Sequence, residues 1–86
     1  MVTYNTENLT KHSVTAIEVD EILSDSGTIW LDLGPSRAGN DRLMFIGFTK
    51  DGRALEVGIE LIGEDEYVFH AMAAGEHYLK EFNDAQ

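Results

Sequence analysis

The first part of the chain spaces its residues as a helix does. Thr6, Leu9 and His12 recur at intervals of three, which places them on one side of a short helix. A side-chain oxygen at Asn5 or Thr6 would accept a hydrogen bond from the free backbone N–H groups of the first turn. The pattern therefore predicts a short, capped helix around residues 8–11.

A second helix is predicted directly after the first. Thr15 and Glu18 have the spacing of a capping box, in which each side chain bonds the backbone N–H of the other, and Val14 precedes the cap as a staple residue. Apolar residues then recur with helical spacing as far as Leu23. The polar turn formers and the glycine of residues 24–27 end the helix.

From Thr28 onward the period of the pattern changes to two, which predicts strands. Four such segments follow one another, namely residues 28–33, 42–48, 54–61 and 67–71. Asp51-Gly52, between the second and third segments, is a strong hairpin signal because both central residues of that turn need a positive φ. The second segment is apolar on both faces, which predicts an interior strand covered on both sides.

The last residues return to helical spacing. Met72, Leu79 and Phe82 lie on one stripe, with charged residues opposite. Gly75 interrupts this stripe and costs about 1 kcal/mol relative to alanine, so a start after Gly75 also fits. The expected fold class is α+β: a four-stranded antiparallel meander with two short N-terminal helices and one C-terminal helix.

Length and composition point to one small domain. Two domains would need roughly 50 residues each, so residues 1–86 are expected to form a single α+β domain. Because the chain has no cysteine, disulfides, iron–sulfur clusters and cysteine nucleophiles are excluded. The longest apolar run, residues 43–48, is too short to cross a membrane. Residues 1–5 lack the basic-then-apolar order of a secretion signal, so we expect a cytoplasmic protein.

The chain is strongly acidic. Sixteen acidic and six basic residues give a formal net charge of −10. Such a charge repels nucleic acid through the long-range interaction that supplies most non-specific binding. An action on RNA would therefore need a local cluster of basic residues, and a basic protein is the partner that the overall charge favours.

The histidines offer a possible metal site. His77 and Glu81 lie one helical turn apart, and His70 would be a third ligand from the preceding strand. This spacing is common by chance and no HExxH pattern accompanies it, so solvated or hydrogen-bonded histidines are the preferred interpretation. Glycine-rich phosphate loops are absent as well. We therefore predict neither a metal nor a cofactor.

The few basic residues suggest a second candidate site. If the short first helix packs across the end of the sheet, Lys11, His12 and Arg42 would form one positive spot suited to a phosphate or an RNA backbone. The alternative is that each residue is an isolated solubilising charge or pairs with a nearby acid such as Asp41 or Asp51. Spacing alone favours this alternative.

An apolar surface is the third candidate site. Trp30 lies on the opposite side of its predicted strand from Ile29 and Leu31. If that side of the sheet faces water, Trp30 would be exposed there, with Met44 and Phe48 from the next strand. An exposed apolar patch usually marks a partner surface. The equally weighted alternative is that helices cover this face and that Trp30 belongs to the core.

Three short motifs together resemble the family of BrnT-type toxins. Residues 8–15 (NLTKHSVT), continued by 18–23 (EVDEIL), resemble the family's opening N..KHGV[ST]..E..E. Residues 42–47 (RLMFIG) resemble its R[FY]..IG strand, and residues 51–55 (DGRAL) resemble its [DG]GR.L hairpin. The likeness extends from Asn8 to Phe82.

This resemblance implies a RelE-like fold and membership of a type II toxin–antitoxin pair, in which an antitoxin holds a ribonuclease toxin. The polar positions that match the family are Lys11, His12, Arg42 and Arg53. Together with His70, these are the candidate catalytic residues.

The chain also departs from the family pattern. Met72 stands where the family usually has an arginine, and Ser13 replaces the usual glycine after the histidine. An arginine that stabilises a pentavalent phosphate contributes orders of magnitude in rate, so its loss argues against efficient RNA cleavage. His70 would substitute in part as a general acid or base, because histidine titrates near neutral pH.

Three functions follow from these observations. The favoured one is a BrnT-like domain that binds a protein partner, an antitoxin or another protein, and has weak or no ribonuclease activity. The first alternative is an active ribonuclease toxin, whose site is built from the candidate catalytic residues and binds RNA only if this basic spot is functional. The second alternative is an unrelated acidic domain that binds a basic protein.

Overall fold

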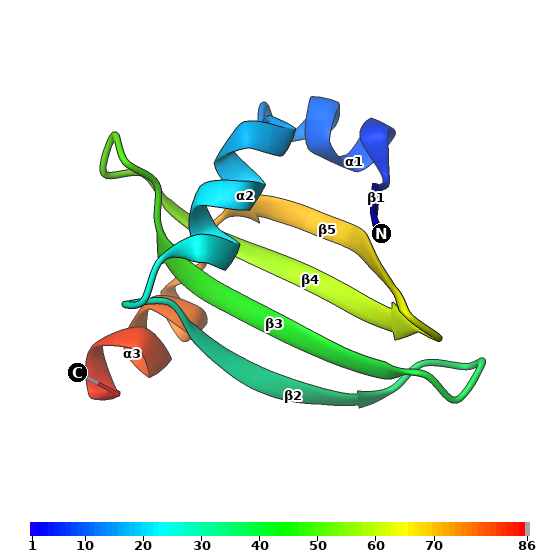
Figure 1. Ribbon diagram of the computed structural model, residues 1–86. Coiled ribbons are helices and arrows are strands. Elements are labelled where there is room, and N and C mark those ends of the chain that lie inside the picture. Colours follow the sequence, from blue (N-terminus) through cyan, green and yellow to red (C-terminus); the bar gives the residue numbers. More distant parts are fainter. Residues whose placement is uncertain (86) are drawn as a thin grey trace.

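The structure, a computed structural model, describes residues 1–85 and has five strands and three helices in that range (Figure 1). In chain order the elements are β1 (Val2–Tyr4), α1 (Thr6–Lys11), α2 (Ala16–Ser24), β2 (Ile29–Pro35), β3 (Asp41–Phe48), β4 (Ala54–Ile62), β5 (Asp65–Ala73) and α3 (Glu76–Asp84). The strands form one sheet in the order β1-β5-β4-β3-β2. The predicted α+β class is confirmed. No helix within the described range has the length and apolarity needed to span a membrane.

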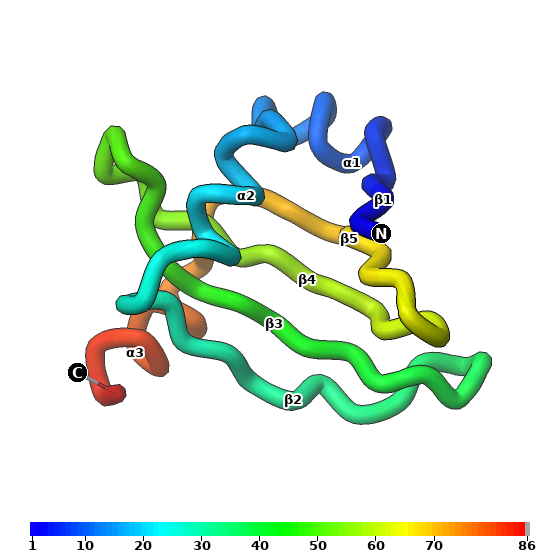
Figure 2. Tube along the Cα trace, in the orientation of Figure 1, coloured from blue at the N-terminus to red at the C-terminus, as the bar shows by residue number. Residues whose placement is uncertain are grey.

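The predicted sheet of four antiparallel strands is wrong, because the sheet is mixed and has five strands. Strands β2 to β5 form an antiparallel meander, and β1 adds to the outer side of β5 in parallel, pairing Val2 with Glu66 and Tyr4 with Val68. Figure 2 shows this N-terminal segment beside β5. A strand of three residues is too short to show a period of two, and its partner lies far along the chain. Sequence patterns therefore miss it.

Of the two starts predicted for the last helix, the one after Gly75 is confirmed and the one at Met72 is wrong. β5 continues to Ala73, so Met72 lies in a strand, where it pairs with Glu56 of β4. Gly75 is the N-cap of α3. The backbone N–H of Gly75 donates a 2.8 Å hydrogen bond to Oε1 of Glu56. Pairing in the sheet satisfies the backbone of residues 72–73, and the helix begins only beyond the glycine.

Both N-terminal helices begin at the caps that the sequence predicts. Oδ1 of Asn5 accepts a hydrogen bond from the backbone N–H of Asn8 at 3.1 Å. At α2 the capping box is complete, because Thr15 Oγ1 accepts from the N–H of Glu18 at 3.1 Å and Glu18 Oε1 accepts from the N–H of Thr15 at 3.0 Å. Between the helices, Ser13 has a φ of 55°. The chain therefore turns sharply at the α1–α2 junction.

The main core lies between α1, α2 and one face of the sheet, which we call the helix face. Alternate residues of β4 and β5 point to this face and meet apolar side chains of the N-terminal segment. The buried cluster consists of Leu9, Val14, Val19, Ile22, Leu55, Val57, Ile59, Val68 and Ala71. Burying a side chain of the size of valine or leucine stabilises the fold by about 1.5–3 kcal/mol. The helix face therefore buries nine of the eleven core side chains found among the described residues, Met44 and Ile46 being the other two.

The opposite face of the sheet, which we call the α3 face, is covered by α3 at one end only (Figure 1). Phe82 of α3 packs edge to face on Phe48 of β3, with ring centroids 5.4 Å apart. Farther along the sheet, the ring of Phe69 lies over Gly58, where a Cβ would meet it at 2.7 Å. The sheet thus covers part of this face with its own aromatic side chains.

At the end of the sheet away from α3, Glu60 organises the loop that joins β2 and β3. Its Oε2 accepts hydrogen bonds from Nδ2 of Asn40 and from Oγ of Ser36, both at 2.9 Å. The hydrogen bond from Asn40 has the largest effect on Glu60 and lowers its pKa, and the bond from Ser36 lowers it further. Desolvation raises the pKa by a smaller amount, and the charge of Arg42 lowers it slightly. The carboxylate form is the one that holds the loop.

The stability contributed by Glu60 is expected to depend on pH. Because its pKa is lower in the folded chain, this contribution is full above the ordinary glutamate pKa of 4.5 and is lost as the pH falls through the lowered value. In urea unfolding, wild type should exceed Glu60→Gln in stability at pH 7, and the difference should shrink toward pH 3. Glu64→Gln, in the exposed β4–β5 turn, is the matched control. A difference that is constant from pH 7 to pH 3 would contradict this assignment.

Candidate functional site

Arg53, directly before β4, holds the α1–α2 junction. Its Nη1 donates to the carbonyl oxygen of Ser13 at 2.8 Å, and its Nη2 donates to that of His12 at 3.2 Å. Nη1 also lies 3.4 Å from Oε2 of Glu18, with which it forms an ion pair. The sharp turn at Ser13 places both carbonyl groups within reach of one guanidinium. Arg53 therefore has a structural role at this junction.

His70, on β5, is held by a buried carboxylate. Its Nε2 lies 2.8 Å from Oε2 of Glu56, so that an Nε2–H of the ring donates to the carboxylate. Glu56 is only 7% exposed, and its other oxygen accepts the N–H of Gly75. A β-bulge between the pairs of Gly58 and Ile59 with β5 turns His70 to the same side of the sheet as Glu56.

The two histidines meet at the edge of β5. α1 lies along this edge, where Oδ1 of Asn8 accepts the backbone N–H of Ala71 at 2.9 Å. The rings of His12 and His70 are 6.1 Å apart and stand edge to face. We call His12, Arg53, Glu56 and His70 the two-histidine cluster. The cluster contains two imidazole rings, which are groups that can donate and accept protons. It also contains a carboxylate, which orients one of the two rings.

Two of the predicted catalytic residues do not belong to this cluster. Arg42 lies near the start of β3 and pairs with Glu60, roughly 20 Å along the strands from the hairpin that carries Arg53. Its Nε and Nη2 donate to the carbonyl oxygens of Gly34 and Leu33, at 3.2 and 3.3 Å. Lys11 is exposed in the last turn of α1. The structure thus brings His12, Arg53 and His70 together but separates them from Arg42.

The register of the strands also separates the predicted apolar patch. Trp30 pairs with Phe45, so it lies on the helix face, where it is 59% exposed. Met44 and Phe48 alternate with Phe45 and lie on the α3 face. Met44 is 5% exposed, and Phe48 contacts Phe82. The expectation that Trp30, Met44 and Phe48 share one surface is therefore wrong, because of these three only Trp30 lies on the helix face.

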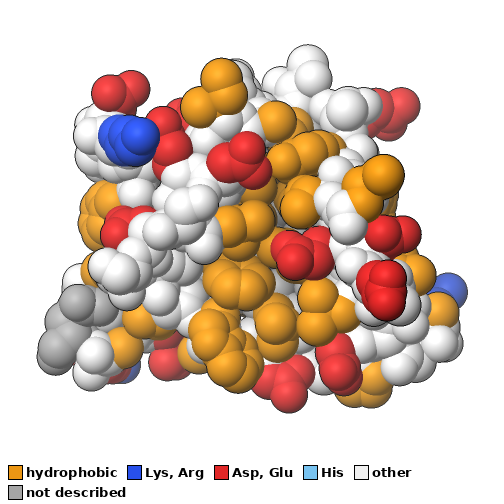
Figure 3. All heavy atoms as spheres, in the orientation of Figure 1, with side chains coloured by type: hydrophobic (Ala, Val, Ile, Leu, Met, Phe, Trp, Pro, Cys, Tyr) orange, Lys and Arg blue, Asp and Glu red, His pale blue; other side chains and the backbone are white. Residues whose placement is uncertain are grey.

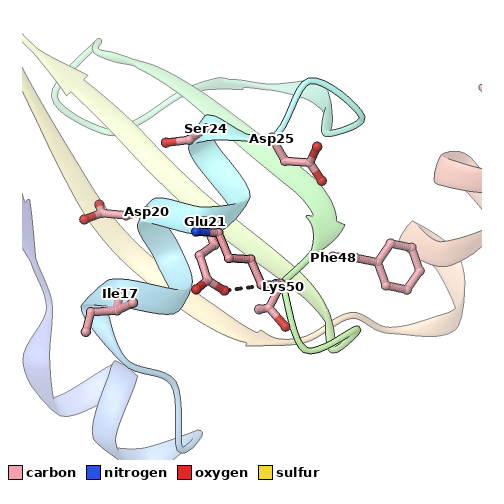
Figure 4. A pocket seen from close by; sticks show the side chains of 8 residues that line it. Ile17, Asp20, Glu21, Ser24, Asp25, Phe48 and Lys50 are labelled. Carbon is pink, nitrogen blue, oxygen red and sulfur yellow. Dashed lines mark hydrogen bonds between the residues drawn. The ribbon is translucent and has the colours of Figure 1, made fainter.

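A shallow groove of about 530 Å³ lies between α2 and the β3–β4 hairpin (Figure 4). Oε1 of Glu21 accepts the backbone N–H of Lys50 at 3.0 Å and ties the hairpin to the helix. The groove is lined by Ile17, Asp20, Glu21, Ser24, Asp25, Phe48, Thr49 and Lys50. Three carboxylates and one lysine give it an acidic character.

The residues of the possible metal site have other contacts. The Nε2 of His70 is occupied by Glu56, and the ring of His77 packs on that of Tyr78 with centroids 5.1 Å apart. Among residues 1–85, no group of three or more histidine and acidic side chains is arranged to hold a metal ion.

Sequence reasoning missed Glu56, the most buried member of the two-histidine cluster. It alternates with apolar residues in the clearest strand pattern of the chain, and such a position normally faces water. Its burial depends on α3 and on His70, which reach it only after the chain has returned to the sheet. The spacing of the residues carries no signal of this contact.

Comparison of the chain with protein-family models and with curated protein sequences finds no match.

Proposed function

We propose that this chain is a BrnT-like domain that binds a protein partner and has weak or no ribonuclease activity. The observation that carries the proposal is the engagement of both candidate arginines. Arg53 donates to the carbonyl groups of His12 and Ser13, and Arg42 donates to those of Leu33 and Gly34. Each guanidinium thus stabilises the backbone at a distinct corner of the fold.

The electrostatics support the same proposal. Stabilising the charge of a cleaved phosphate requires cations that converge on one point. Here His70, whose ring lies beside that of His12, is paired with Glu56, and Arg53 is paired with Glu18. On a chain with a net charge of −10, these carboxylates oppose the approach of an RNA backbone.

The alternative of an active ribonuclease is favoured by one observation, the closeness of the two histidines. With ring centroids 6.1 Å apart, His12 and His70 are placed to act as a general acid and a general base on one phosphodiester. Glu56 would then orient His70, as a carboxylate commonly orients a catalytic histidine. This alternative predicts that both histidines are needed for cleavage.

An RNA-cleavage assay with the purified chain at low salt separates the two functions. We expect no cleavage above that of the double variant His12→Ala, His70→Ala, because the charges around the cluster disfavour RNA. His77→Ala, which removes a histidine outside the cluster, is the matched control. Cleavage that is lost in the double variant and kept in His77→Ala would refute the proposal and establish the ribonuclease.

A further inference from the structure

The helix layer of the fold leaves part of the sheet uncovered. In Figure 1, α1 lies over β5, and α2 crosses the sheet near the end that carries the β3–β4 hairpin. Toward the β2–β3 loop and the β4–β5 turn, no helix formed by residues 1–85 covers the remainder of the helix face. β2 is the edge strand there and pairs with β3 alone.

Apolar side chains gather on this uncovered area. Trp30 and Phe45 are paired and point to the helix face, and Leu43 and Leu61 lie on the same face by their register. Trp30 and Leu61 are 59% and 36% exposed, and the other two are half-buried. We call these four residues the open sheet face. Figure 3 shows hydrophobic side chains running over the sheet beside α2.

Carboxylates border the open sheet face. Asp32 lies on β2, on the same face as Trp30, and Glu66 lies on β5, opposite Leu61. Asp20 projects from α2, where it accepts the hydroxyl of Tyr4 at 3.1 Å. All three acids are exposed. In Figure 3 acidic side chains surround the hydrophobic area, whereas basic side chains appear only at the margins of the view.

We infer that the open sheet face binds a basic amphipathic helix of a partner protein. The inference deepens the proposed partner-binding function and rests on it. Asp32 and Glu66 are separated by β3 and β4, which makes three strand spacings of about 4.8 Å. A helix about 10 Å in diameter fits between them, with its apolar stripe on Leu43 and Leu61 and its lysines or arginines reaching the acids on both sides.

Charge decides between the possible occupants. A second copy of this chain would bring another net charge of −10 against the same acidic border, which repels it. A basic helix meets opposite charge on both flanks and completes the helix layer beside α2. The acidic border and the missing helix thus select the same kind of partner.

Trp30 reports on this site directly, because it is the single tryptophan of the chain. The probe is a synthetic peptide of about 14 residues, with leucines at helical spacing on one side and lysines on the other. We expect its addition to shift the Trp30 emission to shorter wavelength and the affinity to fall as salt is raised. The same peptide with glutamate in place of lysine, or with a central proline, should not bind.

Matched charge variants test whether the acidic border is the cause. Asp32→Asn with Glu66→Gln should weaken binding of the lysine peptide about fivefold to tenfold. Asn at position 32 keeps the oxygen that accepts the N–H of Gly34. Glu81→Gln with Asp84→Asn, on α3, changes the net charge equally and should leave the affinity within about twofold.

Several outcomes would overturn the inference. Equal weakening by both pairs of substitutions would mean general charge attraction, and equal binding of the proline peptide would mean that no helix is recognised. An emission shift that grows with protein concentration alone would identify a second copy as the occupant. RNA cleavage in the separate assay would refute the proposed function itself, whereas a silent cleavage assay with no peptide binding would refute only the helix site.

Discussion

Replacement of Glu56 by alanine is expected to lower the free energy of unfolding by about 2–3 kcal/mol, because two hydrogen bonds to a buried carboxylate are lost. One of these bonds holds His70 on β5, and the other holds the N–H of Gly75 at the start of α3. A single side chain on β4 thus joins the candidate site to the last helix. Glu56 itself is only 7% exposed, and its removal leaves both donors without this buried partner.

Urea unfolding and hydrogen exchange together test this prediction. The backbone amide of Gly75 should exchange faster in Glu56→Ala than in wild type, since it loses its acceptor. Glu56→Gln, which keeps one acceptor oxygen, should be less stable than wild type and more stable than Glu56→Ala. Glu81→Ala, on the exposed side of α3, is the control and should change the stability by less than about 0.5 kcal/mol. Unchanged protection of Gly75 in Glu56→Ala would contradict the assigned contact.

Replacement of Gly47 by alanine should lower the free energy of unfolding by about 2 kcal/mol, within the range for overpacked sites. A Cβ at this position would collide with Oγ1 of Thr28. That hydroxyl cannot move away freely, because it donates a 2.6 Å hydrogen bond to the carbonyl oxygen of Ile22 at the end of α2. The close approach of β3 to the α2–β2 connection therefore requires glycine.

A double-mutant cycle tests the cause of this effect. In the background of Thr28→Ala the hydroxyl is absent, so Gly47→Ala should cost less there than in wild type. Gly27→Ala is the matched control in the same connection, because its Cβ would lie 3.7 Å from the nearest atom, at ordinary contact distance. Additive effects of the two substitutions at positions 28 and 47 would show that the collision is not the source of the loss.

The hydrogen bonds of Arg53 and Arg42 show that two of the six basic residues serve the fold. Arg53 and Arg42 lie at opposite ends of the β3–β4 pair, where each donates to two backbone carbonyl oxygens. A guanidinium supplies several such donors in a fixed plane. Because two of the six basic side chains are engaged in this way, few cations remain to contact a nucleic acid.

The elements with strong local signals were predicted well. The capping box of Thr15 and Glu18, a hairpin at Asp51-Gly52 and the four strands of the meander depend on neighbours in the sequence. The predicted turn type is wrong, because Gly52 has a positive φ of 85° but Asp51 does not, and the loop spans residues 49–53. The strand β1 and the strand character of Met72 were missed, because each depends on pairing with a distant segment. The predicted patch of Trp30, Met44 and Phe48 is wrong for a related reason. The pairing of Trp30 with Phe45 places Trp30 on the helix face, whereas Met44 and Phe48 lie on the α3 face.

Reading the chain alone is enough to establish the α+β class, the order of most elements and the acidic character of the protein. These depend on residue type and on short-range spacing. The three-dimensional packing, in contrast, brings the rings of His12 and His70 together, buries Glu56 beside His70 and Gly75, and leaves Trp30 exposed on the helix face. Each of these outcomes requires contacts between segments that are far apart in the chain, and periodicity contains no information about which distant segments will pair.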